Sequence, residues 1–208
     1  MASDRTALLV AGALSVLCGC HGGVEQVPLL DDLVTPRDRF FDVFTRTGDE
    51  VVVIGEGGKI LRSDDAGERW VRAQTSVDAA LMRIAFADRE RGWVVGQGGV
   101  VLRTDDGGRT WSPQRSDTDR HLFGVAVASR DAVFACGDRS QWIRSEDGGE
   151  HWQGGSVALS DVGMDPDIAL AVREPIYYDV TFLDDRTGWM VGDYGNIRFT
   201  TDGGRSWA

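Results

Sequence analysis

The stretch Thr104-Asp105-Asp106-Gly107-Gly108-Arg109-Thr110-Trp111 decides the fold of this chain, because it is one of four copies of a single motif. The other copies occupy residues 63–70, 145–152 and 200–207, and each copy reads Ser/Thr-x-Asp-x-Gly-x-x-Trp. Successive motif tryptophans lie 41, 41 and 55 residues apart. A recurring period of this size indicates one supersecondary unit used several times.

Each residue type in the motif suits a tight turn. An aspartate carboxylate accepts hydrogen bonds from backbone N–H groups further along the turn, and a Ser/Thr hydroxyl bonds locally in the same way. Glycine allows a positive φ, and tryptophan covers the turn with a large apolar ring. We therefore expect the motif, an Asp box, to be structural. Its residues are Ser63, Asp65, Gly67, Trp70, Thr104, Asp106, Gly108, Trp111, Ser145, Asp147, Gly149, Trp152, Thr200, Asp202, Gly204 and Trp207.

The strands around the box are clearest in the second repeat. Residues 82–86 alternate between apolar and polar, as a half-buried strand does, and residues 92–96 form a continuous apolar run. Residues 97–99 suit a hairpin turn, residues 100–103 a third strand, and Trp111 opens a fourth. Four antiparallel strands per repeat are the signature of a β-propeller blade. We name these strands a, b, c and d, so that the Asp box is the c–d turn.

This pattern predicts an all-β, β-propeller-type fold with four Asp-box blades in residues 39–208. The blades are expected at about residues 39–75, 80–116, 121–154 and 176–208, with an insertion at 155–175. The sequence ends one residue after the fourth box, so the last blade should lack its outer strand. Either a segment around residues 24–30 supplies that strand or the propeller is incomplete; we favour an incomplete propeller.

The N-terminus predicts export. Residues 7–18 are an apolar run too short to span a bilayer, and they end in Leu17-Cys18-Gly19-Cys20, which resembles a bacterial lipobox. We expect residues 1–19 to be a lipoprotein signal peptide, Cys20 to be the lipidated residue, and residues 20–38 to be a linker. An ordinary secretory signal or a simple anchor helix are the alternatives. The expected location is the bacterial cell envelope.

The composition excludes several classes of function. A chain of 208 residues that is 42% hydrophobic can bury a core, and its net charge of −11 argues against nucleic-acid binding. The cysteines show neither a disulfide framework nor metal-ligand spacing, and Cys136 falls on an apolar strand position, where a buried free thiol is expected. We expect no metal and no cofactor.

The second repeat carries a family resemblance. From residue 92 to residue 111 it reads Gly-Trp-Val-Val-Gly-x-Gly-Gly-x-x-x-Arg-Thr-x-Asp-Gly-Gly-x-Thr-Trp, and the fourth repeat shares the Gly-Trp-x-Val-Gly strand. This pattern resembles the photosystem II assembly and stability factors, which are neuraminidase-repeat proteins, and the resemblance covers about residues 38–208. It implies a multi-bladed, non-catalytic propeller with a protein partner, namely a membrane complex that is being assembled or stabilised.

A carbohydrate-binding or glycoside-hydrolysing propeller is the main alternative. The four box aspartates would then be catalytic, although one copy per blade suits architecture better. A sialidase would need an Arg-Ile-Pro segment, which is missing, and Tyr177 and Tyr178 are unplaced aromatics. Asp165 and Asp167 are an acidic pair outside the repeats, with too few ligands for calcium. A nonfunctional gene fragment is a third reading.

Propeller geometry predicts where a partner would bind. Strand directions alternate, so the a–b turns and the Asp boxes share one face, and the b–c turns and d–a links share the other. The b–c turns at residues 138–141 and 193–196 depart most from the Gly-Gly pattern. Loops on a rigid scaffold usually carry function. We expect the partner face to include the link at residues 153–175 together with Asp138, Arg139, Tyr194 and Asn196.

Arginine recurs at one position of three repeats, in Arg62, Arg103 and Arg144. The three side chains would form a basic ladder for an anionic partner if they were exposed. Pairing with the neighbouring acidic turns is the reading that we favour.

Overall fold

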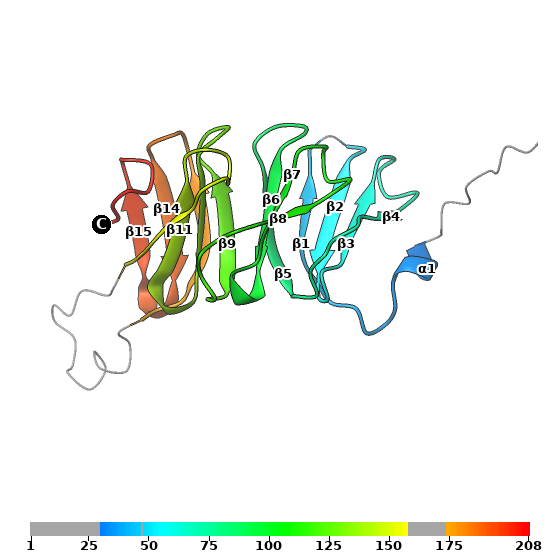
Figure 1. Cartoon of the computed structure of the whole chain (residues 1–208), viewed down its shortest axis with the longest axis horizontal. Helices are drawn as coiled ribbons and strands as arrows, with labels where there is room; N and C mark the ends of the chain where they lie inside the picture. Colours follow the sequence, from blue (N-terminus) through cyan, green and yellow to red (C-terminus); the bar gives the residue numbers. More distant parts are fainter. Residues whose placement is uncertain (1–29, 47, 158–173) are drawn as a thin grey trace, which may run out of the picture.

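The computed structural model describes residues 30–46, 48–157 and 174–208. These residues form four antiparallel sheets that follow one another in sequence order (Figure 1). The first sheet contains β1 (Phe40–Thr45), β2 (Val51–Gly55), β3 (Ile60–Ser63) and β4 (Val71–Arg72). The second contains β5 (Leu81–Phe86), β6 (Gly92–Gly96), β7 (Val101–Thr104) and β8 (Ser112–Gln114).

The third sheet contains β9 (Leu122–Val127), β10 (Val133–Gly137), β11 (Gln141–Ser145) and β12 (Gln153–Ser156). The fourth has three strands, β13 (Tyr177–Phe182), β14 (Gly188–Gly192) and β15 (Ile197–Thr200). Beyond its Asp box, Ala208 exchanges two backbone hydrogen bonds with Phe199, each 3.0 Å long, as the first residue of an outer strand would. Strands β4, β8 and β12 hold this outer place in the other sheets.

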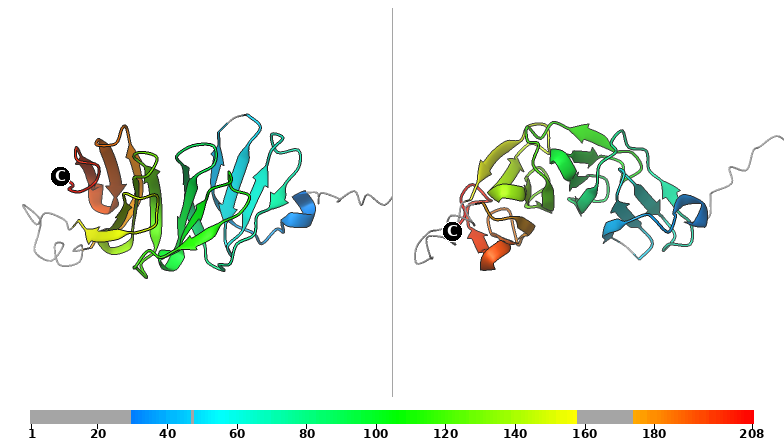
Figure 2. Two further views of the ribbon diagram at one scale, coloured as in Figure 1. Left: turned by 45° about the horizontal axis from the view of Figure 1, so that its top comes forward. Right: turned by 90° about the horizontal axis from the view of Figure 1, so that it is seen from below.

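The four sheets form an open arc. Strands β1, β5, β9 and β13 contact one another in turn along its inner side, and the first and fourth sheets stand apart at its two ends (Figure 2). The expected all-β, incomplete propeller is confirmed. The expected alternative of a strand at residues 24–30 falls almost wholly outside the described residues; Leu30 begins a short helix, α1 (Leu30–Leu33).

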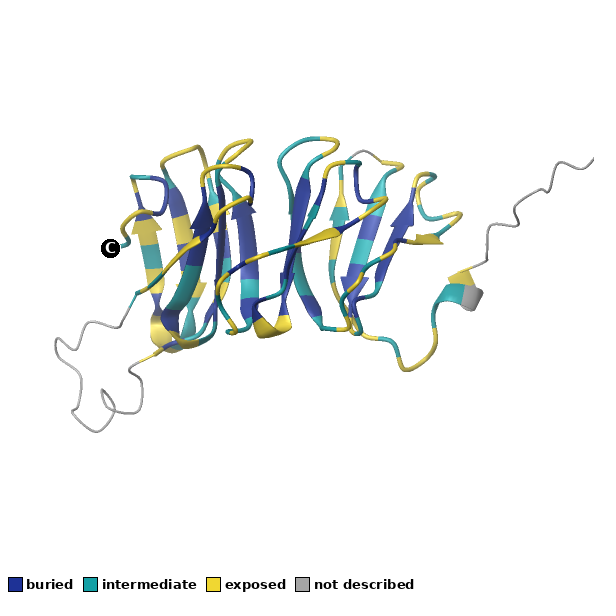
Figure 3. Cartoon of the chain, in the orientation of Figure 1, coloured by how far each residue is buried: buried dark blue, intermediate teal, exposed yellow. Residues whose placement is uncertain are grey.

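Three apolar clusters hold neighbouring sheets together, one at each junction. Between the second and third sheets, for example, Trp93, Val95 and Val101 pack against Leu122 and Trp152. Figure 3 shows the buried residues concentrated in the strands of the middle sheets. Stability is therefore expected to come from repeated sheet-to-sheet contacts, with each sheet supporting the next.

Candidate functional site

Each Asp box closes its own turn through one repeated hydrogen-bond network. In the second sheet the Thr104 hydroxyl donates to Asp106 Oδ1 over 2.8 Å and accepts from the Gly108 N–H over 2.9 Å. Asp106 Oδ1 also accepts from the N–H groups of Arg109 and Thr110, both at 2.9 Å, and the Trp111 indole N–H donates to the Gly108 carbonyl over 3.1 Å. The box carboxylate is thus already engaged by its own turn.

These contacts keep the box carboxylates ionised. The backbone N–H of His151 is the largest cause that lowers the pKa of Asp147 below its usual range. Partial burial raises the pKa of Asp202, but hydrogen bonds from Ser206, Thr200 and two backbone N–H groups outweigh it and lower the pKa to about 2. A general acid needs a pKa near the working pH. The boxes therefore have the chemistry of turn anchors.

The boxes lie along one edge of the arc, which we call the box edge. Each box donates a backbone N–H to the a–b turn of its own sheet: Gly107 to the Glu90 carbonyl, Gly148 to that of Asp131 and Gly203 to that of Arg186, all at 2.8 Å. In the first sheet Ala66 donates to the Asp49 carbonyl over 2.9 Å. The boxes and the a–b turns thus share one face, at the top of Figure 1.

Two of the recurring arginines link their own sheet to the Asp box of the next sheet. Arg62 Nε donates to the Gly107 carbonyl over 3.1 Å, and Arg103 Nη1 donates to the Gly148 carbonyl over 3.0 Å. Each of the two also pairs with the acidic residue two positions on, as does Arg144 with Glu146. Arg62 and Arg144 are buried, at 8% exposure each. The preferred pairing with acidic turns therefore describes them, and they offer little surface to an anionic partner.

The opposite edge, which we call the turn edge, consists of the four b–c turns and the described parts of the d–a links. Each b–c turn donates a backbone N–H to the chain segment that leads into its own sheet, for example Gln97 to the Ala80 carbonyl over 2.8 Å and Asp138 to the His121 carbonyl over 2.9 Å. Ser140 joins both described ends of the long link. Its N–H donates to the Pro175 carbonyl over 2.7 Å, and its carbonyl accepts from the Val157 N–H over 3.1 Å.

Two of the expected partner residues stand exposed on the turn edge in a strained backbone conformation. Arg139 has φ 53° and Tyr194 has φ 57°, both in the left-handed region. The equivalent residues in the first two sheets are Gly57 and Gly98, at φ 65° and 67°. A residue with a side chain pays roughly 1–2 kcal/mol for this conformation, and such strain concentrates at functional sites. Tyr194 is 63% exposed.

Asn196 was expected to be part of the partner face, but its side chain is not exposed there. It is buried, at 6% exposure, and its side-chain amide donates to the Asp193 carbonyl over 2.6 Å. The amide closes the turn that presents Tyr194, so Asn196 shapes the turn edge from within. Asp138 is half-buried in the corresponding turn.

Aromatic residues that the sequence left unplaced also lie at this edge. The Tyr178 hydroxyl donates to Asp193 Oδ1 over 2.8 Å, and its ring lies 6.1 Å from that of Phe123 on the neighbouring sheet. Phe123 in turn contacts His121, with ring centroids 6.3 Å apart. The alternation along β13, with Tyr177 buried and Tyr178 half-exposed, is the signal that could have separated the two tyrosines.

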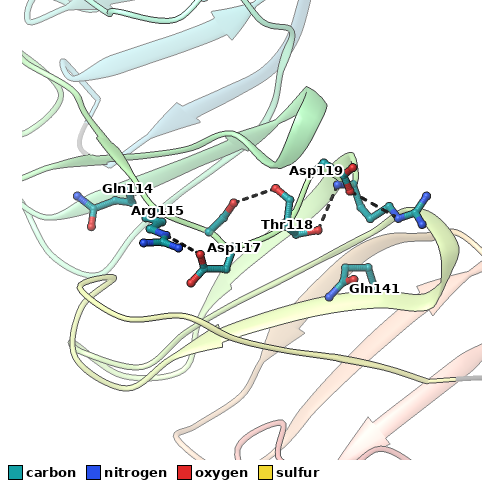
Figure 4. Close-up of a pocket in the computed structure, with 8 residues that line it drawn as sticks. Gln114, Arg115, Asp117, Thr118, Asp119 and Gln141 are labelled. Carbon is teal, nitrogen blue, oxygen red and sulfur yellow. Dashed lines mark hydrogen bonds and ion pairs between the residues drawn. The ribbon is translucent and has the colours of Figure 1, made fainter.

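A broad, open hollow of about 750 Å³ lies on the turn edge between the second and third sheets (Figure 4). The link at residues 114–120 and Gln141 line it. Ser116 fixes this link to the η1 turn (Gln97–Gly99) by donating to the Gly99 carbonyl over 2.6 Å, and Arg115 pairs with Asp117 at 2.6 Å. The hollow is polar and shallow, which suits a surface contact more than an enclosed small-molecule site.

Several expected sites can be placed, and others cannot. Cys136 is fully buried, and burial raises the pKa of its thiol well above the ordinary range, as expected of an inert structural cysteine. Cys20, Asp165 and Asp167 lie outside the described residues. Within 30–46, 48–157 and 174–208, no helix is both long and apolar enough to cross a membrane. In the same part of the chain, no three His, Cys, Asp or Glu side chains gather as a metal site.

The fold and this site define a class: propeller-repeat proteins of the Asp-box type that hold exposed loops on rigid sheets. Residues 29–105 match the family model described as photosynthesis system II assembly factor YCF48. The photosystem II assembly lipoprotein Ycf48 of Synechocystis sp. is 33% identical over 69 residues, which are 30% of this chain and 20% of that protein. Residues 29–105 are therefore similar to photosystem II assembly factors, and this similarity covers less than half of the chain.

Solved structures of low identity share the fold. YCF48 bound to a D1 peptide superposes with a TM-score of 0.51 at 24% identity, over 66% of this chain and 42% of that one. YCF48 from Cyanidioschyzon merolae superposes with a TM-score of 0.59 at 17% identity, over 80% of this chain and 52% of that one. An ancestral GH74 enzyme superposes with a TM-score of 0.63 at 16% identity, over 81% of this chain and 23% of that one. The chain therefore spans between about a fifth and half the length of these relatives.

Proposed function

We propose that this chain is an exported, non-enzymatic scaffold that binds a protein partner along its turn edge. The observation that carries the proposal is the strained, exposed backbone of Arg139 and Tyr194 at turns where the first two sheets have glycine. Arginine and tyrosine are common anchors of protein interfaces. The rigid sheets behind them are already ordered, so binding costs little conformational entropy.

The proposed partner is a subunit of a membrane complex that is being assembled or stabilised. The resemblance to photosystem II assembly factors supports this class, because one of them has been solved with a D1 peptide bound. We further propose that Cys20 carries a lipid anchor after removal of residues 1–19, followed by a linker at residues 20–38. The matched relative from Synechocystis sp. is a lipoprotein, which supports an anchored protein of the cell envelope.

The experiment replaces the two strained residues by the glycine found in the equivalent turns. The Arg139→Gly/Tyr194→Gly double variant removes both side chains and relieves the left-handed strain, so its melting temperature should stay equal to that of the parent or rise. Its binding should fall at least about tenfold. Binding is measured by anisotropy of a labelled D1 peptide and by cross-linking in host membranes.

An Arg130→Ala variant is the matched control, because Arg130 is 69% exposed at its side chain and pairs with Asp88 on the box edge, away from the proposed binding surface. It should bind as the parent does. Undiminished binding by the folded double variant would refute this site. If the double variant still binds the partner and substitutions on the box edge abolish binding, the partner binds the box edge instead.

Glycoside recognition is the second candidate, favoured by the superposition on the ancestral GH74 enzyme. At 16% identity that likeness reaches no further than the fold. The box carboxylates accept hydrogen bonds within their own turns, so they do not face one another across a cleft as a glycosidase pair does. Clear turnover of sialosides or β-glucans by the purified chain would promote this candidate over the scaffold.

A further inference from the structure

An apolar pocket of about 330 Å³ lies at the junction between the first and second sheets. Val71 and Ala73 line it from the outer edge of the first sheet, Gly108 lines it from the second Asp box, and Arg62 and Arg109 lie beside them. Small-molecule sites typically have volumes of about 300–1,000 Å³ and combine apolar walls with a few placed polar groups. Both walls belong to sheets that the chain contains, so the pocket does not depend on a further sheet.

The pocket exists because two side chains that fill the next junction are small here. The residue three positions after the box tryptophan is Gln114 in the second sheet and Ala73 in the first. The second residue of strand b is Trp93 in the second sheet and Val52 in the first. A Cβ placed on Gly149 of the third box would lie 2.9 Å from Trp93 Nε1 and 3.6 Å from Gln114 Oε1. Valine and alanine therefore leave open the space that tryptophan and glutamine occupy at the second junction.

The junction between the third and fourth sheets is filled as well. Phe134 holds the position of Val52, and its ring stacks on Trp142 with the ring centroids 5.6 Å apart. Gly155 holds the position of Ala73, and a Cβ on it would collide with the Trp142 ring. Large side chains thus occupy two of the three junctions, and the first is left with a hollow.

The pocket has a guanidinium at its exposed side that carries no paired carboxylate. Arg109 donates from Nη1 to a carbonyl of its own box over 2.7 Å, and it forms no ion pair within the described part of the chain. Arg205 makes the same contact in the fourth box over 3.0 Å, but it also pairs with Glu146 at 2.5 Å. The first sheet has Asp64 at the Glu146 position, one methylene shorter, and this carboxylate pairs with Arg62.

We propose that this pocket binds a small molecule that joins a short aliphatic chain to a carboxylate. The apolar walls favour the transfer of an aliphatic group out of water, and a guanidinium can donate two parallel hydrogen bonds to a carboxylate. The chain has a net charge of −11, which repels anions in general, so carboxylate binding depends on Arg109. The pocket lies beside an Asp box and is separate from the turn edge.

The test titrates the full chain, held in mild detergent, with hexanoate and with the neutral hexanamide. Two-dimensional NMR follows the tryptophan indole N–H signals. Trp111 donates its indole N–H to the Gly108 carbonyl over 3.1 Å at the pocket wall, so its signal should shift. Trp152 holds the same box position at the filled second junction, and its signal should stay in place. Hexanoate should bind at least about fivefold more tightly than hexanamide.

Two variants separate the apolar and the charged parts of the site. Ala73→Gln gives the first sheet the side chain that helps to fill the second junction, so it should fold and weaken hexanoate binding at least about tenfold. Arg109→Gln should weaken hexanoate binding at least about fivefold and leave hexanamide binding unchanged. Arg205→Gln is the matched control, because Arg205 holds the same box position in the fourth sheet, and it should bind hexanoate as the parent does.

Far-ultraviolet circular dichroism checks that each variant is folded. A Trp111 signal that hexanoate leaves unmoved would overturn the proposal, and so would undiminished hexanoate binding by the folded Ala73→Gln variant. Equal losses in Arg109→Gln and Arg205→Gln would also overturn it, since the overall charge and not the pocket would then govern binding. None of the three substituted residues lies on the turn edge, so these outcomes are independent of partner binding there.

Discussion

At the scale of the residue, the box aspartate organises each turn because one oxygen accepts several hydrogen bonds at once. Asp202 Oδ1 accepts from the N–H groups of Arg205 and Ser206, and its other oxygen accepts from the Ser206 hydroxyl at 2.6 Å. Protonation would remove acceptor capacity from this network. Folding therefore favours the ionised form of the carboxylate, and the stability of the protein is linked to pH.

Acid should weaken the fold through these aspartates. The pKa of Asp202 is about 2 in the folded chain, below the value of about 3.9 in an unfolded chain. Its stabilisation is fully present above about pH 4 and is lost as the pH falls toward about 2. The urea midpoint of the parent should fall between about pH 6 and about pH 2.5, and that of Asp202→Asn should fall less.

The control for this pH dependence is Asp119→Asn, because the Asp119 side chain is 97% exposed. Its midpoint should follow that of the parent across the whole range. If Asp202→Asn loses as much stability on acidification as the parent does, the box carboxylate is not a source of the pH dependence.

The box tryptophan contributes by burial. Trp111 is 5% exposed, lies in the cluster between the first and second sheets, and contacts the edge of Phe86. Trp111→Ala should lower the free energy of unfolding by about 3–5 kcal/mol, as for other core aromatics. Trp70→Ala is the matched control, since Trp70 holds the same box position but is partly exposed. Equal losses in urea melts would contradict this account.

At the scale of the element, the b–c turns show why the Gly-Gly pair recurs. Gly98 and Gly99 both have positive φ, but a side chain would destabilise the turn for a different reason at each position. A Cβ on Gly98 would meet nothing within 4 Å, so the conformation alone carries the cost. A Cβ on Gly99 would lie 1.9 Å from the Thr118 carbonyl oxygen of the adjoining link.

Alanine at these two positions should therefore have unequal effects. Gly98→Ala should lower the free energy of unfolding by about 1–2 kcal/mol, because alanine is strained in the left-handed conformation. Gly99→Ala should cost clearly more, because the link at residues 116–118 must also move away. Thermal melts of the two single variants measure the difference. Equal shifts, or a larger shift for Gly98→Ala, would show that the link does not pack on the turn as described.

The strands and turns of each sheet could largely be predicted from the sequence. The repeat period, the turn residues and the alternation of apolar and polar residues all indicate the same four-stranded unit. The burial of Asn196 could not, because nothing in a single turn sequence shows that its amide folds back on Asp193. The ion pair of Arg83 with Asp179 could not either, since it joins strands of the second and fourth sheets across Gly124. Such contacts depend on how neighbouring sheets are stacked.

At the scale of the whole molecule, the arc separates two edges with different chemistry. The box edge is fastened by hydrogen bonds between each box and its a–b turn, and by arginines that reach the next box. The turn edge carries the strained Arg139 and Tyr194. The division into two faces could be predicted from alternating strand directions, whereas the backbone strain at the two residues could be inferred only by comparison with the equivalent glycines.

The anchor is a prediction about where the molecule resides. Cys20 lies outside the described residues, so the lipobox pattern carries the argument. A metabolic palmitate analogue should label the parent, and Cys20→Ser should lose the label and remain unprocessed or become soluble. Cys136→Ser is the control, because that thiol is buried and should not take up lipid. Equal labelling of Cys20→Ser and the parent would contradict the lipoprotein assignment.

Hydrogen exchange with and without the captured partner tests the central claim most directly, since it reports on both edges in one measurement. The account predicts that binding slows exchange in the turns at residues 138–141 and 193–196. Exchange in the four Asp boxes should be unchanged by the partner. Protection confined to the boxes, with the two turns unaffected, would contradict the assignment of the turn edge as the binding surface.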